Sequence, residues 1–455
     1  MWSSVNEKIT DGTSGLNSNN GPKAIVVGTS SKGSLNKALS IGKKSNVESI
    51  LGYGEMPNRI LDMQKTMADV SIVALPTEGD ILGTISTVET IGNTVITAIG
   101  TPSYTSDIQI TVSNEGIIGT VEVTIASTGD KVHEESVIIP IDGIITRDDL
   151  GLSIIFPIDE DLIYTSANSW SFSTIAPTSS LKVLEAAITQ ALEIYTPEFV
   201  FIAQSVNGEF VKSLGSISER LFEDHKPVLF LTETDLDITR SLEEAIADKK
   251  TEFAKIDARF VSVVCQPGYI ITSAGKVKRS AAGLCAGHLT KSNVNQSIGA
   301  TNNFAIYDFE LLDTWNNTHS RSLDESRLIT LRTYAGLNNL FWTNGRTLAS
   351  DKSDYRFIEI VRTVFKAIKL SRRAALPYIQ SNGDSIGLQN LLTEVRSAID
   401  TMVTNTPKEL DDFEIDLPTD QNVANNGVIL NIELFGIPII RTINLNFMFK
   451  YNQSN

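Results

Sequence analysis

The stretch from Glu198 to Val264 contains three short apolar runs, Glu198-Phe-Val-Phe-Ile-Ala203, Pro227-Val-Leu-Phe-Leu231 and Arg259-Phe-Val-Ser-Val-Val264. Continuous apolar runs of this length are typical of strands buried on both faces of a parallel sheet. A segment of helical periodicity precedes each run; these segments are Leu181–Leu192, Ile217–Glu223 and Arg240–Ala254. Three helix-then-strand units in succession predict an α/β core with covering helices, within a chain that is α+β as a whole.

The N-terminal run Lys23-Ala-Ile-Val-Val27 has the same buried character and is expected to join that sheet. After it, the residue pattern predicts a helix at Leu35–Ile41, a second helix at Pro57–Ala68 and a strand at Ser71–Leu75. These elements form the first part of the predicted α/β core.

The pattern changes between residues 81 and 176. Ile108, Ile110 and Val112 alternate with polar residues, and glycine-containing turn signals recur between such runs. Alternation with regularly spaced turns is typical of a β-sandwich or barrel. We therefore expect an all-β domain that is inserted into the α/β core and able to fold semi-independently.

The last third of the chain predicts long helices at Asp354–Ala375 and Leu388–Met402 and a strand at Val428–Leu434. A final strand is predicted over Ile443–Tyr451. Its apolar positions are Ile443, Leu445, Phe447, Phe449 and Tyr451. A strand so close to a chain end frays unless something pairs with it, so these residues are predicted to form an intersubunit strand.

Residues 1–20 are rich in serine, asparagine and glycine and hold few apolar residues, Val5 and Ile9 among them. Such a segment cannot build a core by itself, so an extended N-terminal arm is predicted. Both chain ends are expected to reach neighbouring subunits. Because such a contact joins two different surfaces, it generates rings or helices rather than a closed pair.

The composition narrows the function classes. Apolar residues make up 41% of the chain and charged residues 20%, an ordinary balance for a folded protein of several domains. A net charge of −16 argues against nucleic-acid binding, which requires clustered cations. No signal peptide and no membrane insertion are expected, because the chain start and the apolar runs lack those patterns. Cys265 and Cys285 are interpreted as buried thiols in a reducing cytoplasm.

Residues that could carry out chemistry are scattered along the chain. Gly28-Thr-Ser-Ser-Lys-Gly33-Ser34 has the outline of a phosphate-cradling loop, but Ser34 stands where that loop needs a lysine. It is interpreted as an ordinary turn with helix capping, with nucleotide binding as the alternative. The four histidines have no metal-ligand spacing. The sequence therefore predicts no enzyme, no catalytic residue, no metal and no cofactor.

A basic stripe is the clearest charged feature. Arg362, Lys366, Lys369 and Arg373 recur at helical spacing opposite the apolar stripe of the helix predicted from Asp354. Two interpretations stay open, a solvated face and a docking face for an acidic partner. The acidity of the rest of the chain adds weight to the second, and the first stays open.

Several motifs resemble contractile tail sheath proteins of myophages and of related phage-like contractile injection systems (R-type bacteriocins). The first is Trp342-Thr-Asn-Gly-Arg346, followed by Asp354-Tyr-Arg356 at the start of a long helix. Ser280-Ala-Ala-Gly-Leu-Cys-Ala-Gly287 and Gln296-Ser-Ile-Gly299 resemble the small-residue helix and following loop of that family. Trp170-Ser-Phe-Ser-Thr174 resembles part of its inserted β domain.

The resemblance implies a structural subunit that polymerises as stacked hexameric rings in a helical sheath. The sheath surrounds an inner tube and contracts to drive that tube through a target cell envelope. The implied partners are the chain itself, the inner tail tube protein, and baseplate and tail terminator proteins. Arg362, Lys366, Lys369 and Arg373 would face the tube. The implied location is a virion tail or injection particle assembled in the bacterial host cytoplasm.

The expected domain layout follows from the pattern and the resemblance together. It comprises an N-terminal arm (1–20), the α/β core in two parts (21–80 and 177–333), an inserted β-sandwich-like domain (81–176), a C-terminal sheath domain (334–437) and a C-terminal strand or arm (438–455). Two alternatives remain open at this point. One is an α/β nucleotide-binding hydrolase with a decorating β domain, and the other is a secreted adhesin or surface-layer protein.

Overall fold

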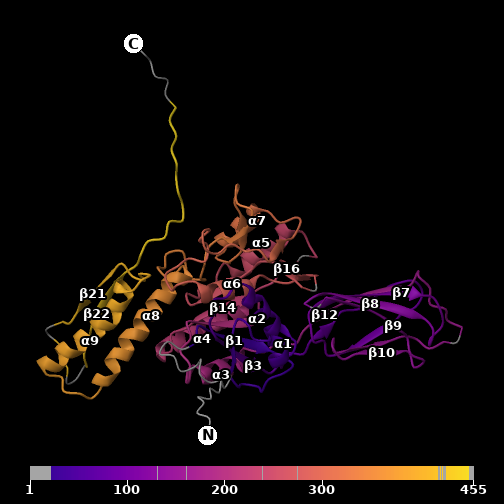
Figure 1. The fold of residues 1–455 in the computed structure, drawn as a ribbon, viewed down its shortest axis with the longest axis horizontal. Helices are drawn as coiled ribbons and strands as arrows, with labels where there is room; N and C mark the ends of the chain where they lie inside the picture. The colour runs from indigo at the N-terminus through magenta and orange to yellow at the C-terminus, as the bar shows by residue number, and fades with distance from the viewer. Residues whose placement is uncertain are drawn as a thin grey trace, which may run out of the picture. The chain divides into compact units, whose positions relative to one another are not determined.

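A six-stranded sheet forms the centre of the first of two units in the computed structural model, Met1–Phe365 and Lys366–Asn455 (Figure 1). The structure describes residues 22–449 except 131, 160, 238, 274, 419–420, 422 and 424–426. The strands of this sheet are β1 (Ala24–Thr29), β2 (Leu39–Ile41), β3 (Ile72–Thr77), β13 (Phe199–Ser205), β14 (Leu229–Glu233) and β15 (Val261–Val264).

The sheet order is β15-β14-β13-β1-β3-β2, and every neighbouring pair is parallel except β2 with β3. The predicted mixed α/β class is confirmed, and so is the place of the first strand, since β1 lies between β13 and β3. The parallel strands are almost entirely buried because their side chains are apolar on both faces.

The helices of this unit are α1 (Val47–Leu51), α2 (Glu55–Thr66), α3 (Leu181–Leu192), α4 (Gly208–Glu223), α5 (Leu242–Phe253), α6 (Ala282–Lys291) and α7 (Asn317–Glu325). Several start at a side chain that satisfies a free backbone N–H group. Asn207, for example, accepts a hydrogen bond from the Phe210 N–H at 2.9 Å, which starts α4. The apolar side chains of α3, α4 and α5 complete the core over the sheet.

The helix predicted at Leu35–Ile41 is wrong. Leu39–Ile41 is strand β2, which pairs antiparallel with Ile72–Ala74 of β3. A short apolar run fits either a helix or a strand by pattern alone, and pairing with an open sheet edge determined the outcome here.

Strands β4 to β12 lie in sequence between β3 and β13, which belong to the central sheet, and we call Thr84–Ile175 the β region. They are β4 (Thr84–Ile85), β5 (Glu89–Ile91), β6 (Thr97–Gly100), β7 (Ser106–Asn114), β8 (Glu122–Gly129), β9 (His133–Ile138), β10 (Ile144–Arg147), β11 (Leu152–Ile155) and β12 (Ser169–Ile175). One sheet has the order β4-β12-β7-β8-β9, with β5 also on β12, and the other has the order β10-β11-β6. Trp170 and Phe156 pack edge to face in the core of the β region, with ring centroids 5.5 Å apart.

Two small sheets complete the first unit. The strands are β16 (Gly268–Thr272), β17 (Gly275–Lys278) and β18 (Phe309–Leu311), then β19 (Leu331–Thr333) and β20 (Leu340–Trp342). Trp342, from the sheath-like motif, is fully buried and donates from its indole Nε1 to His288 Nδ1 at 3.0 Å. Burial lowers the pKa of His288 to about 3, so this histidine is a neutral acceptor within the core.

The second unit begins within α8 (Ile358–Ala375). The remaining elements are a 3₁₀ turn (Leu376–Tyr378), α9 (Ser385–Thr404), β21 (Asp412–Asp416) and β22 (Asn431–Phe435). Val395, Ile399 and Met402 of α9 pack with Phe413 of β21 in a separate core. Both predicted helices are present, each with slightly different ends. The domain boundaries predicted from the sequence remain expectations.

Candidate assembly interface

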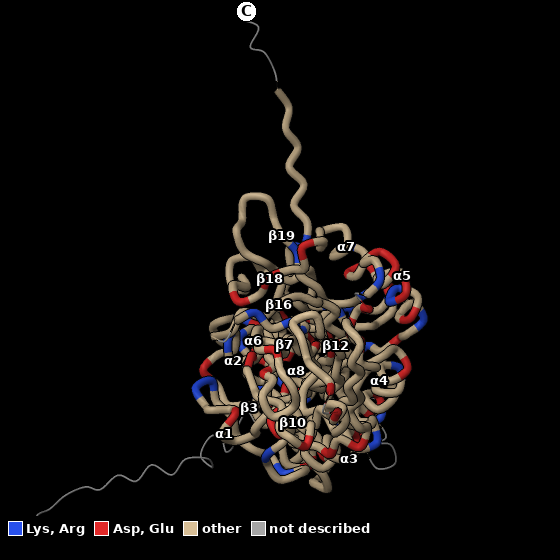
Figure 2. The backbone as a smooth tube through the Cα atoms, turned by 90° about the vertical axis from the view of Figure 1, so that its right-hand side faces the viewer, with Lys and Arg blue, Asp and Glu red and all other residues tan. Residues whose placement is uncertain are grey.

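The C-terminal segment, residues 436–449, is the most exposed apolar stretch of the second unit. These described residues form neither helix nor strand. Phe447 is 91% exposed and Ile443 is 73% exposed, and Leu445 and Phe449 are similarly open. None of the described residues after Arg441 is charged. The trace that leads to the C-terminus is accordingly tan in Figure 2. The described part of the chain therefore leaves this apolar surface exposed.

The strand predicted at Ile443–Tyr451 is thus not formed within one chain over its described part. Backbone N–H and C=O groups form a strand only where a neighbouring strand completes the ladder. Tyr451 lies outside the described residues, as do Val5 and Ile9 of the predicted N-terminal arm.

The sheet that directly precedes this segment in the sequence has only two strands among the described residues. β21 pairs antiparallel with β22, from Asp412–Phe435 to Asp416–Asn431. A two-stranded sheet leaves an edge on each side with unpaired backbone groups, and α9 packs against one of its faces. Such edges are where an added strand can bind.

The basic stripe does not form one surface. Arg362 is 2% exposed, and its guanidinium donates to the Ser292 Oγ at 2.7 Å and to the Glu198 Oε2 at 2.5 Å. It also donates to the Leu289 and Ser292 carbonyls at the end of α6. Placing Arg362 on a tube-facing surface was therefore wrong. Helical spacing identifies the face of a helix, but not whether a neighbouring element covers it.

Glu198 explains why Arg362 is buried at low cost. Burial alone would favour the neutral acid, but Arg362 and Lys23 together lower the pKa of Glu198 to about 2. The carboxylate therefore joins the start of β1, the start of β13 and the first half of α8. The side chains of Lys23, Glu198 and Arg362 thus form a structural ion cluster within the first unit.

The other three residues of the stripe belong to the second unit. Lys366 pairs with Glu409 at 2.5 Å and is partly exposed. Lys369 is half-buried, and Arg373 is exposed. The stripe therefore reaches the surface only in the second half of α8.

The loop after β1 does not have the geometry of a phosphate site. Gly33 has a φ of +98°, and the chain then turns into β2 rather than into a helix. A phosphate-cradling loop depends on the N-terminus of a following helix, so the hydrolase alternative is not supported. The described residues also contain no cluster of histidine, cysteine and acidic side chains suited to a metal ion.

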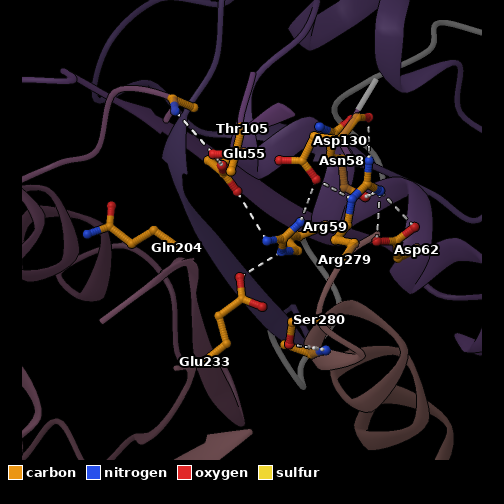
Figure 3. A network of polar contacts seen from close by, with 12 residues as sticks. Glu55, Asn58, Arg59, Asp62, Thr105, Asp130, Gln204, Glu233, Arg279 and Ser280 are labelled. Carbon is orange, nitrogen blue, oxygen red and sulfur yellow. Dashed lines mark hydrogen bonds and ion pairs between the residues drawn. The ribbon is translucent and has the colours of Figure 1, made fainter. Parts of the chain in front are cut away.

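A buried ionic network was missed by the sequence analysis (Figure 3). Its members are Glu55, Arg59, Asp62, Asp130, Glu233 and Arg279, all buried. Arg59 Nε lies 2.6 Å from Glu233 Oε1, and Arg279 Nη1 lies 2.9 Å from Asp62 Oδ2. The sequence carries no local signal for it, because helical spacing places Glu55, Arg59 and Asp62 on one polar face of α2, and such a face is normally solvated.

The helices within the described ranges include none with the length and apolarity of a membrane span. The two cysteines are buried free thiols, and burial raises the pKa of Cys265 to about 12. Neither thiol is therefore reactive in the folded chain.

Known protein families match this sequence over nearly its whole length. Family models match residues 2–346 as the N-terminal domain of DUF2586 and residues 354–454 as its C-terminal domain. No curated protein matches the sequence.

Among solved structures, the sheath complex of an extracellular contractile injection system (PVC) in its contracted state is similar. It is 12% identical, with 100% of this chain and 99% of that chain covered and a TM-score of 0.54. The contracted helical sheath of the anti-feeding prophage is 11% identical, with 98% of each chain covered and a TM-score of 0.53. The sheath tail protein from Desulfitobacterium hafniense is 13% identical, with 96% of this chain and 100% of that chain covered and a TM-score of 0.51. The chain belongs to the DUF2586 family and has the fold of contractile sheath proteins.

Proposed function

We propose that this chain is a non-enzymatic structural subunit of a contractile sheath. It polymerises as stacked hexameric rings around an inner tube and contracts to drive the tube through a target cell envelope. The observation that carries this proposal is the fold match along the full length of the chain to a contracted sheath subunit. A match limited to the central sheet would support no such function, because that architecture serves many activities.

The C-terminal segment is proposed as the intersubunit strand, through Ile443, Leu445, Phe447, Phe449 and Tyr451. Its exposed apolar side chains support this role, since monomers rarely leave so much apolar surface in water. Pairing with an open sheet edge on a neighbour would add several backbone hydrogen bonds, each contributing about 0.5–1.5 kcal/mol net. The N-terminal arm, with Val5 and Ile9, is proposed to make the second link between subunits.

Lys366, Lys369 and Arg373 are proposed to face the inner tube. They lie on the half of α8 that belongs to the second unit, and Arg373 is exposed. Singly, exposed charge pairs contribute about 0–1 kcal/mol, but repetition along a filament multiplies their effect.

Other proposed partners are the inner tail tube protein and baseplate and tail terminator proteins, in a virion tail or injection particle assembled in the bacterial host cytoplasm. Contraction is proposed as a change between two packings of one subunit, an extended state that is kinetically trapped and a better-packed contracted state. The two chain ends would keep subunits linked while the folded units rotate as rigid bodies.

Negative-stain electron microscopy of the purified full chain at high concentration tests the proposal. Tubes or stacked six-fold rings are expected, and turnover of nucleoside triphosphates is expected to be absent. Discrete particles at every concentration, with the inner tube protein also present, would contradict the sheath function.

A further inference from the structure

The β region and the central sheet have separate apolar cores. Trp170, Phe156 and Ile110 belong to one cluster, and the central strands with α3, α4 and α5 belong to another. The two clusters have no residue in common among the described positions. The chain passes between them at two points that lie side by side, since Ile81 and Thr178 pair with each other. A shared apolar core therefore does not fix the orientation of the β region, and such an arrangement allows relative motion by default.

The buried ionic network lies across this boundary. Asp130, directly after β8, comes from the β region, whereas Arg59 on α2 and Arg279 directly after β17 lie outside it. Arg279 Nε lies 2.6 Å from Asp130 Oδ1, and Arg279 Nη2 donates to the Asp130 backbone carbonyl at 2.8 Å. Arg59 Nη1 lies 3.4 Å from the same Asp130 carboxylate oxygen. Arg279 therefore binds both the side chain and the backbone of Asp130. Two contacts of this kind restrain both the position of Asp130 and the direction of the chain that leaves β8.

A second contact crosses the boundary beside the first. The Thr105 hydroxyl, just before β7, donates to Glu55 Oε1 at 2.9 Å. Glu55 Oε2 in turn lies 3.2 Å from Arg59 Nη2. The network thus holds the β region at two turns, one before β7 and one after β8 (Figure 3).

The charge balance gives Asp130 a special role. Four carboxyl groups share two guanidinium groups, and burial raises the pKa values of Glu55, Asp62 and Glu233. Burial also opposes ionisation of Asp130, but Arg279 and Arg59 together lower its pKa. Asp130 is therefore the most firmly ionised carboxylate of the network and the main counter-charge that the β region supplies to the two arginines.

We propose that Asp130, held between Arg59 and Arg279, clamps the β region in one orientation on the central sheet. The clamp makes the β region and the central sheet move as one rigid body. It stands whether or not the chain forms a sheath, because it depends only on contacts within the first unit. Removing the Asp130 charge leaves two buried guanidinium groups without their shared partner, which weakens the clamp and the fold together.

The test measures orientation directly in the full chain. Spin labels at Glu134→Cys on β9 and Glu209→Cys on α4 lie on exposed positions of the two parts, and both native cysteines are buried. Electron–electron double resonance should give one narrow distance peak for the labelled parent chain. With Asp130→Asn added, we expect loss of that single peak and a melting temperature about 5 °C lower.

Asp107→Asn is the matched control. Asp107 also crosses the boundary, to Lys278 at 3.8 Å, but both side chains are about half exposed. The control should keep the narrow peak, since exposed ion pairs contribute little. A folded Asp130→Asn chain with the distance peak of the parent overturns the proposal.

A double variant covers the case in which Asp130→Asn does not fold. Asp130→Asn with Arg279→Met removes one carboxylate and one guanidinium together, so fewer buried charges are left unpaired. A broad distance distribution in this folded variant supports the clamp. A narrow peak at the distance of the parent overturns it.

Discussion

Helix α2 and the C-terminal segment depart from the usual distribution of polar and apolar side chains in opposite directions. α2 buries Glu55, Arg59 and Asp62, whereas the C-terminal segment exposes Ile443 and Phe447. The buried ionisable side chains of α2 find ion-pair partners within the same chain. The described part of the same chain does not bury the exposed side chains of Ile443 and Phe447. A second copy of the chain is the proposed partner that would bury them. Buried polar groups in this protein therefore make contacts within the chain, whereas the exposed apolar surface supports the proposed assembly.

The largest expected effect is at the C-terminal segment. A chain truncated before Ile439 should fold normally and form no tubes, because every subunit loses the proposed added strand. Sedimentation beside the full chain measures assembly, and circular dichroism checks folding. Removal of residues 2–19 should have the same outcome. Tubes of normal length from either truncated chain would rule out the strand-exchange interpretation.

The next largest effect should come from the buried network. Arg279→Met removes the guanidinium that Asp62 and Asp130 share and should lower the free energy of unfolding by about 3–5 kcal/mol. Urea unfolding measures this loss. Arg321→Met is the control, since Arg321 and Glu325 form an exposed pair and no measurable change is expected. Equal stability of the two variants would show that burial of the network contributes nothing.

A smaller effect should appear as a pH dependence of stability. Burial and the nearby Asp130 raise the pKa of Glu55 to about 8, from an ordinary value of 4.5. Between pH 4.5 and pH 8, the Glu55 carboxyl group is therefore protonated in the folded chain and ionised in the unfolded chain. The contribution of Glu55 to stability is therefore full below pH 4.5 and is lost as the pH rises towards 8.

Glu55→Gln should flatten that pH dependence by up to about 1.4 kcal/mol per pH unit, because glutamine resembles the neutral acid and does not titrate. Urea unfolding at both ends of the pH window measures the slope. Glu325→Gln, at an exposed carboxylate, should keep the slope of the parent. A parental slope in Glu55→Gln would assign the effect to another group.

The smallest effect on the fold is expected on α8. Reversing the charges of Lys369 and Arg373 should leave the unfolding free energy nearly unchanged and should weaken sheath growth on inner tubes at low salt. Arg362→Met, in contrast, should lower the unfolding free energy of the subunit, because Arg362 is buried against Glu198. Unchanged tube-templated assembly after the double reversal would remove the proposed tube-facing role.

Local patterns in the sequence predicted much of this molecule. Continuous apolar runs such as Phe199–Ala203 and the long amphipathic helix ending at Ala375 were read correctly, because their periodicity extends over many residues. The short run Leu39–Ile41 was not, because only its pairing with β3 makes it a strand. The C-terminal alternation was visible as well, but its described part forms no strand in the chain, and its pairing with a neighbouring subunit stays a proposal.

The sequence by itself determined the mixed α/β class, the alternating β region and the apolar character of the chain end, because each depends on neighbours a few residues apart. Only the tertiary structure showed that Arg362 is buried and that Asp130 lies between Arg59 and Arg279. Those residues are 71 and 149 positions from Asp130 along the chain. No local period records such a contact, because the energy of a buried ion pair depends on how the fold brings distant charges together and excludes water from them.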